Sequence, residues 1–254
     1  MVDRGVLINN LENLFQTCFN KKRYLLDKLH LRQNDIRVTF YKHLMNAIDP
    51  TIHFVIFTHK YLPEGKWWAS IHKEYKIGPR IFADTEEGNY IKEFEYIDYH
   101  ISFAYFHSIF HTFEHSIRTI SLKCFSNNYY KQNNGKKHAP DFRNIFEFFL
   151  RQLRLWQNEY ENFIEIVVKF RNSVHLNGIY YSPTETSHST SGTKPPYVWH
   201  CKNYSFNHGE QIMVNDLWLT YIEFTYEFIN TFDKIIIQSK IQDFTYIEDM
   251  TEPG

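Results

Sequence analysis

The feature that most constrains the fold is a long row of apolar, mainly aromatic side chains between about Tyr90 and Phe125. The row runs at alternating intervals of four and three residues, through Tyr99, Phe103, Phe106, Phe110, Phe113, Ile117, Ile120 and Cys124. These intervals match the 3.6-residue turn of an α-helix and place the row on one face. Because such a face must be covered by other apolar surfaces, we expect a long central helix inside a helical bundle.

Apolar residues recur at helical spacing in several further segments, which should supply the rest of the bundle. These segments are residues 6–31, 35–47, 141–155, 159–176 and 216–238. Pro50 is expected to end the second of them, since proline inside a helix removes a hydrogen bond and clashes with the preceding turn. β-branched and aromatic residues accumulate over 51–58, which favours a short strand there.

The remaining segments are expected to be irregular or to form a small hairpin. Glycines and prolines predict an irregular connection over residues 60–88, and residues 182–196 are of low complexity. Residues 197–213 are expected to form a hairpin. In it Tyr197–Trp199 would pair near Gln211–Met213, around a turn at Asn207-His208-Gly209. The acidic tail that ends at Gly254 is expected to be frayed.

Together these patterns predict a mainly α-helical bundle with a four-helix core, organised as a single domain. Residues 1–88 would form an N-terminal helical extension with its irregular segment, and residues 89–245 would form the core with an insertion at 182–214. The composition agrees, because 18% of the residues are aromatic whereas glycine and proline number only 9 and 8. That balance favours helices packed through Phe and Tyr over a β-sandwich with many turns.

Charge and cysteine usage bound the kinds of partner and the compartment. The formal net charge is −1, from 28 basic and 29 acidic residues, so any contact with nucleic acid would need a local basic patch. Cys18, Cys124 and Cys201 form no CxxC pair, which argues against a disulfide framework or a zinc ribbon. The N-terminus does not resemble a signal peptide, and no apolar run approaches the ~20 residues of a membrane span. We therefore expect a soluble cytoplasmic protein.

A polar pair ends the apolar stripe of the predicted helix over 159–176. Arg171 and His175 are four residues apart, so they project side by side on a face that also carries Ile164 and Val167. Asn177-Gly178 follows, which is typical of a helix C-cap and places His175 in the last turn. A charged pair at the edge of an apolar stripe fits a pocket beside the core, and histidine is suited to general acid–base chemistry.

An Arg-Asn followed shortly by His and then Asn-Gly, near the end of a helix, resembles the motif of HEPN domains. The resemblance implies a helical bundle, frequently dimeric, with the motif helices near the two-fold axis. Many members are metal-independent ribonucleases of toxin–antitoxin, abortive-infection and CRISPR systems. Here His175 would act as general acid or base, Arg171 would stabilise phosphoryl charge, and Asn172 would orient the phosphate or the histidine. The resemblance thus implies an RNA substrate, a homodimer, an antitoxin or defence partner, and no cofactor or metal.

A second, polar stripe lies beside the aromatic stripe of the long helix, and it contains His107, His111, Glu114 and Arg118. One hypothesis is that Glu114 and Arg118 form part of a polar cluster facing Arg171 and His175. Another is that this is simply a solvated helix face. A third is a metal site built from His107 and His111 with His115 or Glu114, since imidazoles four residues apart can share zinc.

The most basic stretch of the chain lies around residues 131–154. We expect weak RNA contacts from Lys136, Lys137 and Arg143, because a ribonuclease must contact phosphates somewhere. Polar loops of this kind are otherwise simply solvated.

Alternatives to a ribonuclease remain open from the residues alone. The interval between Arg171 and His175 is one residue shorter than in the usual HEPN pattern, and the net charge is near zero. Both favour a catalytically inactive module for dimerisation or partner binding, in which Arg171 pairs with a carboxylate and His175 caps the helix. A metal-dependent helical enzyme based on His107 and His111 is a further alternative.

Overall fold

The computed structural model describes residues 3–61, 74, 88–129, 141–174, 179–181, 196–212, 214, 216–239, 241 and 245–251. Most of them are helical, as predicted. The helices are α1 (Arg4–Asp27), α2 (Ile36–Tyr61), α4 (Gly88–Tyr129), α5 (Phe142–Gln152), α6 (Glu159–Val174) and α7 (Leu217–Asp233), which continues into the π-helix η2 (Lys234–Gln238). The strands are β1 (Ile179–Tyr180), β2 (Tyr197–Trp199), β3 (Lys202–Tyr204) and β4 (Glu210–Gln211).

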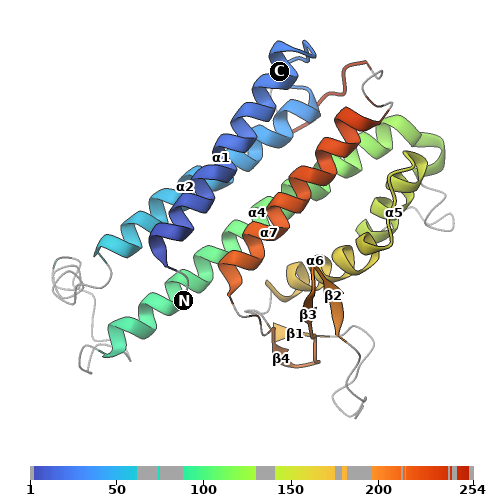
Figure 1. The fold of residues 1–254 in the computed structure, drawn as a ribbon. Helices are drawn as coiled ribbons and strands as arrows, with labels where there is room; N and C mark the ends of the chain where they lie inside the picture. The colour runs from blue at the N-terminus through green and yellow to red at the C-terminus, as the bar shows by residue number, and fades with distance from the viewer. Residues whose placement is uncertain are drawn as a thin grey trace.

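Figure 1 shows α1, α2, α4 and α7 running roughly along one axis, with α5 and α6 on one flank and the short strands beside α6. Aspartates start three of the helices by accepting a hydrogen bond from a backbone N–H of the first turn. Asp3 caps α1, Asp141 caps α5 and Asp216 caps α7. Such caps satisfy N–H groups that have no partner within the helix.

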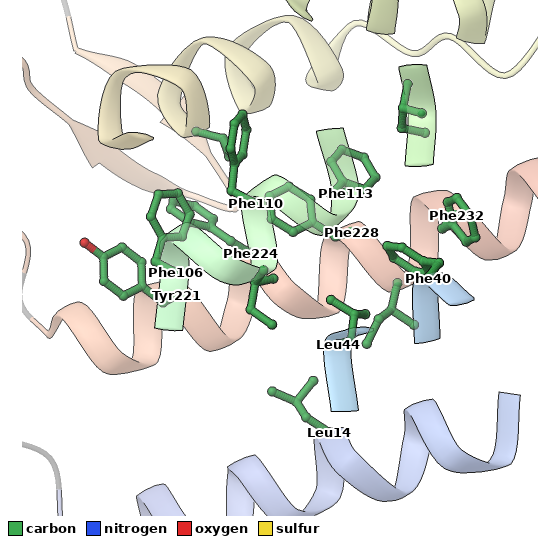
Figure 2. Close-up of a cluster of buried hydrophobic side chains, with 14 of the residues drawn as sticks. Leu14, Phe40, Leu44, Phe106, Phe110, Phe113, Tyr221, Phe224, Phe228 and Phe232 are labelled. Atoms are coloured by element: carbon green, nitrogen blue, oxygen red, sulfur yellow. The ribbon is translucent and has the colours of Figure 1, made fainter. Parts of the chain in front are cut away.

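The predicted aromatic stripe of α4 forms the centre of the core, where it packs against α7 (Figure 2). The ring of Phe106 stacks on Tyr221 at 4.5 Å, and that of Phe113 stacks on Phe228 at 4.3 Å. Offset ring pairs of this kind add to the stabilisation that comes from removing apolar area from water. The prediction of a long central helix in a bundle is confirmed.

The N-terminal helices α1 and α2 lie side by side and bury their apolar faces in the same core. Leu14 of α1 and Leu44 of α2 are fully buried, and Figure 2 shows both below the aromatic rows of α4 and α7. From α2, Phe40 also contacts Phe232 of α7, with 3.8 Å between the ring centroids. The N-terminal pair therefore shares one hydrophobic cluster with the remaining helices.

Helix α2 does not end at Pro50, and the strand predicted over 51–58 does not form. The helix continues to Tyr61 with Pro50 in its interior. Pro50 is exposed, whereas Ile48, Ile52 and Val55 continue the buried face at helical spacing. Proline costs about 3 kcal/mol in a helix interior, and burial of this continuing apolar face outweighs that cost.

The small β region pairs differently from the predicted hairpin. Strand β2 pairs antiparallel with β3, with Tyr197 opposite Tyr204, around a turn at His200-Cys201. Strand β4 instead pairs with β1, with Ile179 opposite Gln211. Both turn residues have positive φ, 47° at His200 and 60° at Cys201, a conformation normally marked by Gly, Asn or Asp. That absence of the usual turn residues is why the sequence pointed to the wrong turn.

The C-terminal segment is held in place and not frayed, as far as residues 245–251 are concerned. Ile247 and Asp249 are buried, and the carbonyl of Ile247 accepts a hydrogen bond from the N–H of Ile36 at 2.8 Å. This backbone pairing attaches the segment to the start of α2.

Most of the predicted irregular connection, residues 62–73 and 75–87, lies outside the described residues, as do residues 182–195 of the low-complexity stretch. Among the helices that the structure describes, none is both long and apolar enough to cross a membrane.

Candidate functional site

The motif residue Arg171 lies in the last turn of α6, which is anchored by an aromatic side chain one residue earlier. Phe170 is fully buried, and its ring contacts Phe224 at 5.4 Å, Tyr221 at 5.8 Å and Tyr204 at 6.2 Å. These rings belong to α7 and β3. The end of α6 is therefore fixed against two other elements, so the direction in which Arg171 leaves the helix is fixed as well.

Arg171 is half-buried and has no acidic partner within the part of the chain that the structure describes. Its Nη1 donates to the side-chain oxygen of the neighbouring Asn172 at 3.0 Å. Asn172 itself is exposed and so leaves the site open to solvent. The carboxylate pair that a purely structural reading predicts for Arg171 is not present among these residues. The guanidinium is available to an external anion, for which its planar fork of donors is suited.

Arg143, a predicted RNA contact, has a different environment. It lies at the start of α5 and bonds to Glu165 of α6, and its Nε lies 3.3 Å from Asp141. Although partial burial opposes it, hydrogen bonding and charge from Glu165 and Asp141 raise the pKa of Arg143. Two carboxylates thus offset its charge, which weakens the argument for a phosphate contact here.

Several predicted site residues lie outside the described residues. These are His175, Lys136 and Lys137. The side-by-side placement of Arg171 and His175 and the contacts of the basic loop therefore both remain predictions.

The predicted polar cluster on α4 contains two pairs of residues four positions apart. Arg118 donates to Glu114 at 2.8 Å, and its guanidinium lies over the ring of Phe142 in α5, 5.6 Å from the centroid. The rings of His107 and His111 are parallel, with centroids 6.3 Å apart, and His111 is exposed. The contact with Phe142 places the Glu114–Arg118 pair against α5.

The geometry gives no support to a metal site on α4. Among the residues that the structure describes, no three His, Cys, Asp or Glu side chains are grouped as metal ligands would be. His115, which the metal reading would recruit, lies 3.1 Å from Asp249 of the C-terminal segment instead. The contact between His115 and Asp249 helps to hold that segment against the bundle.

A lysine on α6, not selected from the sequence, attaches the β region to the helix. The Lys169 ammonium lies 4.7 Å from the ring centroid of Tyr180, 5.4 Å from that of Tyr197 and 5.7 Å from that of Phe206. It also donates to the Tyr180 hydroxyl at 2.8 Å. A cation over several aromatic faces is attracted to the negative charge of each face. Lys169 therefore joins α6 to β1 and β2 close to the motif.

A cavity that the sequence did not predict opens between strand β3 and the first turns of α7. Its volume is about 550 Å³, and its lining includes Lys202, Asn203, Tyr204, Asp216, Leu219 and Thr220. Tyr204 is only 2% exposed, yet its hydroxyl has no hydrogen-bond partner among the described residues. No local pattern could have revealed this cavity, because its walls come together only when the hairpin packs on α7.

Comparison with known proteins gives no relative. Neither a protein-family model, nor a curated protein, nor a solved structure matches the chain. The function must therefore be argued from the site itself.

Proposed function

We propose that this protein is a metal-independent endoribonuclease of the HEPN type, with Arg171 and His175 as its catalytic residues. The observation that supports this function is the state of Arg171: a half-buried guanidinium at the end of a rigidly packed helix, bonded to Asn172 and free of any carboxylate within the described residues. An arginine kept in this state is suited to an anionic ligand such as a phosphodiester.

In this proposal the ribose 2′-oxygen attacks the adjacent phosphorus while the bond from phosphorus to the 5′-oxygen breaks. One histidine, His175, removes the 2′-hydroxyl proton, and a general acid returns a proton to the departing 5′-oxygen. Arg171 stabilises the charge that grows on the phosphoryl oxygens, and Asn172 keeps the guanidinium oriented. The products are a 2′,3′-cyclic phosphate and a free 5′-hydroxyl.

A homodimer belongs to the same proposal. A second copy would bring a second His175 to the phosphate, so that one imidazole serves as base and the other as acid. An antitoxin or another defence protein would then be the natural regulator of such an activity. Sedimentation of the purified protein tests the dimer directly.

The test is cleavage of a mixture of single-stranded and structured RNA in the presence of EDTA. We expect cleavage that ends in a cyclic phosphate and falls about 100-fold or more in both Arg171→Ala and His175→Ala. The matched control is Arg151→Ala, which removes an exposed arginine that pairs with Glu147 on α5. It should cleave like the wild type. A folded wild-type protein that cleaves no RNA, or cleaves it only with added metal, would overturn the proposal.

A second candidate function is a catalytically inactive dimerisation or partner-binding module. It is favoured by the net charge of −1 and by the neutralisation of Arg143, since both leave little positive charge for RNA. In that case Arg171→Ala and His175→Ala would leave every RNA unchanged, while Arg171→Ala would weaken self-association.

A further inference from the structure

The C-terminal segment, residues 245–251, lies against the bundle as a short extended peptide lies in a receptor groove. The N–H of Ile36 donates to the carbonyl of Ile247 at 2.8 Å, and the N–H of Asp249 donates to the carbonyl of Asn34 at 3.0 Å. Backbone pairing of this kind is a recurring mode of peptide recognition, in which side-chain pockets supply the specificity. The main-chain contacts therefore fix the register of the segment.

The side chains of the segment alternate between the groove and the solvent. Ile247 and Asp249 are buried, whereas Glu248 and Met250 are exposed. Residues two positions apart lie on the same face of an extended chain, so the two buried side chains enter the groove together. The groove thus takes an aliphatic side chain and, two positions later, a carboxylate.

Two helices supply the contacts to that carboxylate. Thr39 of α2 donates to one oxygen of Asp249 at 2.5 Å, and Nε2 of His115 on α4 lies 3.1 Å from the other oxygen. The neighbouring Asp35 carboxylate accepts two hydrogen bonds from Arg37, at 2.8 and 2.7 Å, which offset its negative charge. The polar wall of the groove is therefore complementary to an acidic side chain.

Few apolar contacts hold the segment in the groove. Within residues 245–251, Ile247 is the only buried apolar side chain. Tyr246 is partly exposed, and its ring lies 4.7 Å from the guanidinium of Arg32. Segments with few buried apolar contacts open locally at a lower free energy than the whole fold requires. We therefore expect the segment to leave the groove while the helices remain packed.

We propose that this groove is a docking site for an acidic partner peptide, and that the C-terminal segment is its resident occupant. The partner presents an extended segment with an aliphatic residue followed two positions later by an aspartate. It binds when the C-terminal segment leaves. Because that segment belongs to the same chain, it competes at a high effective concentration and keeps the groove closed to weak ligands. This interaction does not depend on the proposed ribonuclease.

The test uses a labelled peptide with the sequence of residues 245–251 and blocked ends, titrated into the full-length protein and followed by fluorescence anisotropy. We expect it to bind the double variant Ile247→Ser/Asp249→Ala, whose own segment is weakly held. Binding to the wild type should be at least tenfold weaker, because the resident segment competes. Absence of binding to the folded double variant would overturn the proposal.

Paired changes on both sides of the groove test the chemistry. A peptide carrying Asp249→Asn should bind about tenfold more weakly, whereas one carrying Glu248→Gln, which loses the same charge at an exposed position, should bind unchanged. In the double variant, adding Thr39→Val should also weaken binding about tenfold, and adding His111→Ala, an exposed residue of α4, should not. Equal binding of the two altered peptides would overturn the acidic specificity.

Amide hydrogen exchange in the wild type gives a test that does not require the double variant to fold. The N–H groups of Ile36 and Asp249 should exchange through a local opening, faster than the N–H of the buried Phe113 and independently of low urea concentrations. Exchange of all three at the rate of global unfolding would overturn the proposal. So would a wild-type dimer that is lost in the double variant, since the groove would then serve a second copy of the chain.

Discussion

Two arginines at the edges of this bundle have opposite surroundings. Arg37, at the start of α2, is buried and donates to both oxygens of Asp35, at 2.8 and 2.7 Å, and to the carbonyl of Ile241 at 3.2 Å. Arg171, at the end of α6, is half-buried, and among the described residues its side chain bonds to the amide oxygen of Asn172 alone. Figure 1 shows the C terminus, which packs on the start of α2, at the end of the bundle away from the strands beside α6.

The difference separates a structural arginine from one available for binding. A charge that is buried without a partner costs several kcal/mol, so Arg37 is compatible with folding only because its donors are satisfied. Arg171 retains access to water, and therefore it can do without a carboxylate. The same contrast holds for hydroxyls, since Thr39 donates to Asp249 at 2.5 Å whereas Tyr204 has no partner among the described residues. The charged groups that fix the C-terminal segment are paired with one another, whereas Arg171 has no carboxylate partner among the described residues.

The largest effect is expected from Arg37→Ala, which would leave the Asp35 carboxylate buried and unpaired. We expect the free energy of unfolding to fall by about 3–5 kcal/mol, measured by urea denaturation. Arg171→Ala should lower it by less than about 0.5 kcal/mol, because no ion pair between described residues is broken. If Arg37→Ala does not fold, the double variant Asp35→Asn/Arg37→Met should recover part of the loss. A loss below 1 kcal/mol would contradict a structural role for Arg37.

A smaller effect is expected from Lys169→Met, which keeps an unbranched chain against the rings but removes the ammonium. Loss of the interaction with three aromatic faces and of the bond to the Tyr180 hydroxyl should cost about 1–2 kcal/mol. The matched control is Lys202→Met, an exposed lysine of the same region that pairs with Glu223. It should cost less than about 1 kcal/mol. Equal losses in the two variants would show that the rings do not stabilise Lys169.

The parts of the fold that were predictable from the sequence depend on local spacing. The stripe from Tyr99 to Cys124 predicts α4 because its residues recur at helical spacing and so lie on one face. The same spacing of apolar residues predicts the helix that carries Arg171. The prediction that the helix ends at Pro50 was wrong. The free-energy cost of a proline in a helix can be read from the local sequence, whereas the burial that outweighs it depends on the neighbouring helices. The pairing of β2 with β3 depends on a turn at His200-Cys201 that no characteristic residue marks.

The parts that were not predictable join residues far apart in the chain. Thr39 and Asp249 are separated by 210 positions, and nothing near either residue marks the other as a partner. The cavity at Tyr204 exists only once the hairpin lies on α7. Arg171 could be selected from its motif, but only the packed structure shows that no carboxylate of the described residues pairs with it.

The smallest effect concerns the pH dependence of the stability that Asp249 contributes in the C-terminal segment. Burial opposes ionisation of Asp249, yet hydrogen bonds from Thr39, Thr251 and His115 outweigh it and lower the pKa of Asp249 to about 2. A carboxyl group whose pKa is lower in the folded state binds its proton more readily in the unfolded chain. Its contribution to stability is therefore complete above about pH 4 and is lost as the pH falls towards 2.

Asp249→Asn isolates this contribution, because asparagine keeps one acceptor oxygen but cannot ionise. At pH 6 the variant should be less stable than the wild type by about 1 kcal/mol, and the difference should shrink as the pH falls from 4 to 2. Urea midpoints of both proteins across this range give the measurement, and Asp27→Asn serves as the control because Asp27 forms only an exposed pair with Arg23. A difference that stays constant with pH would mean that the Asp249 contacts do not depend on its charge.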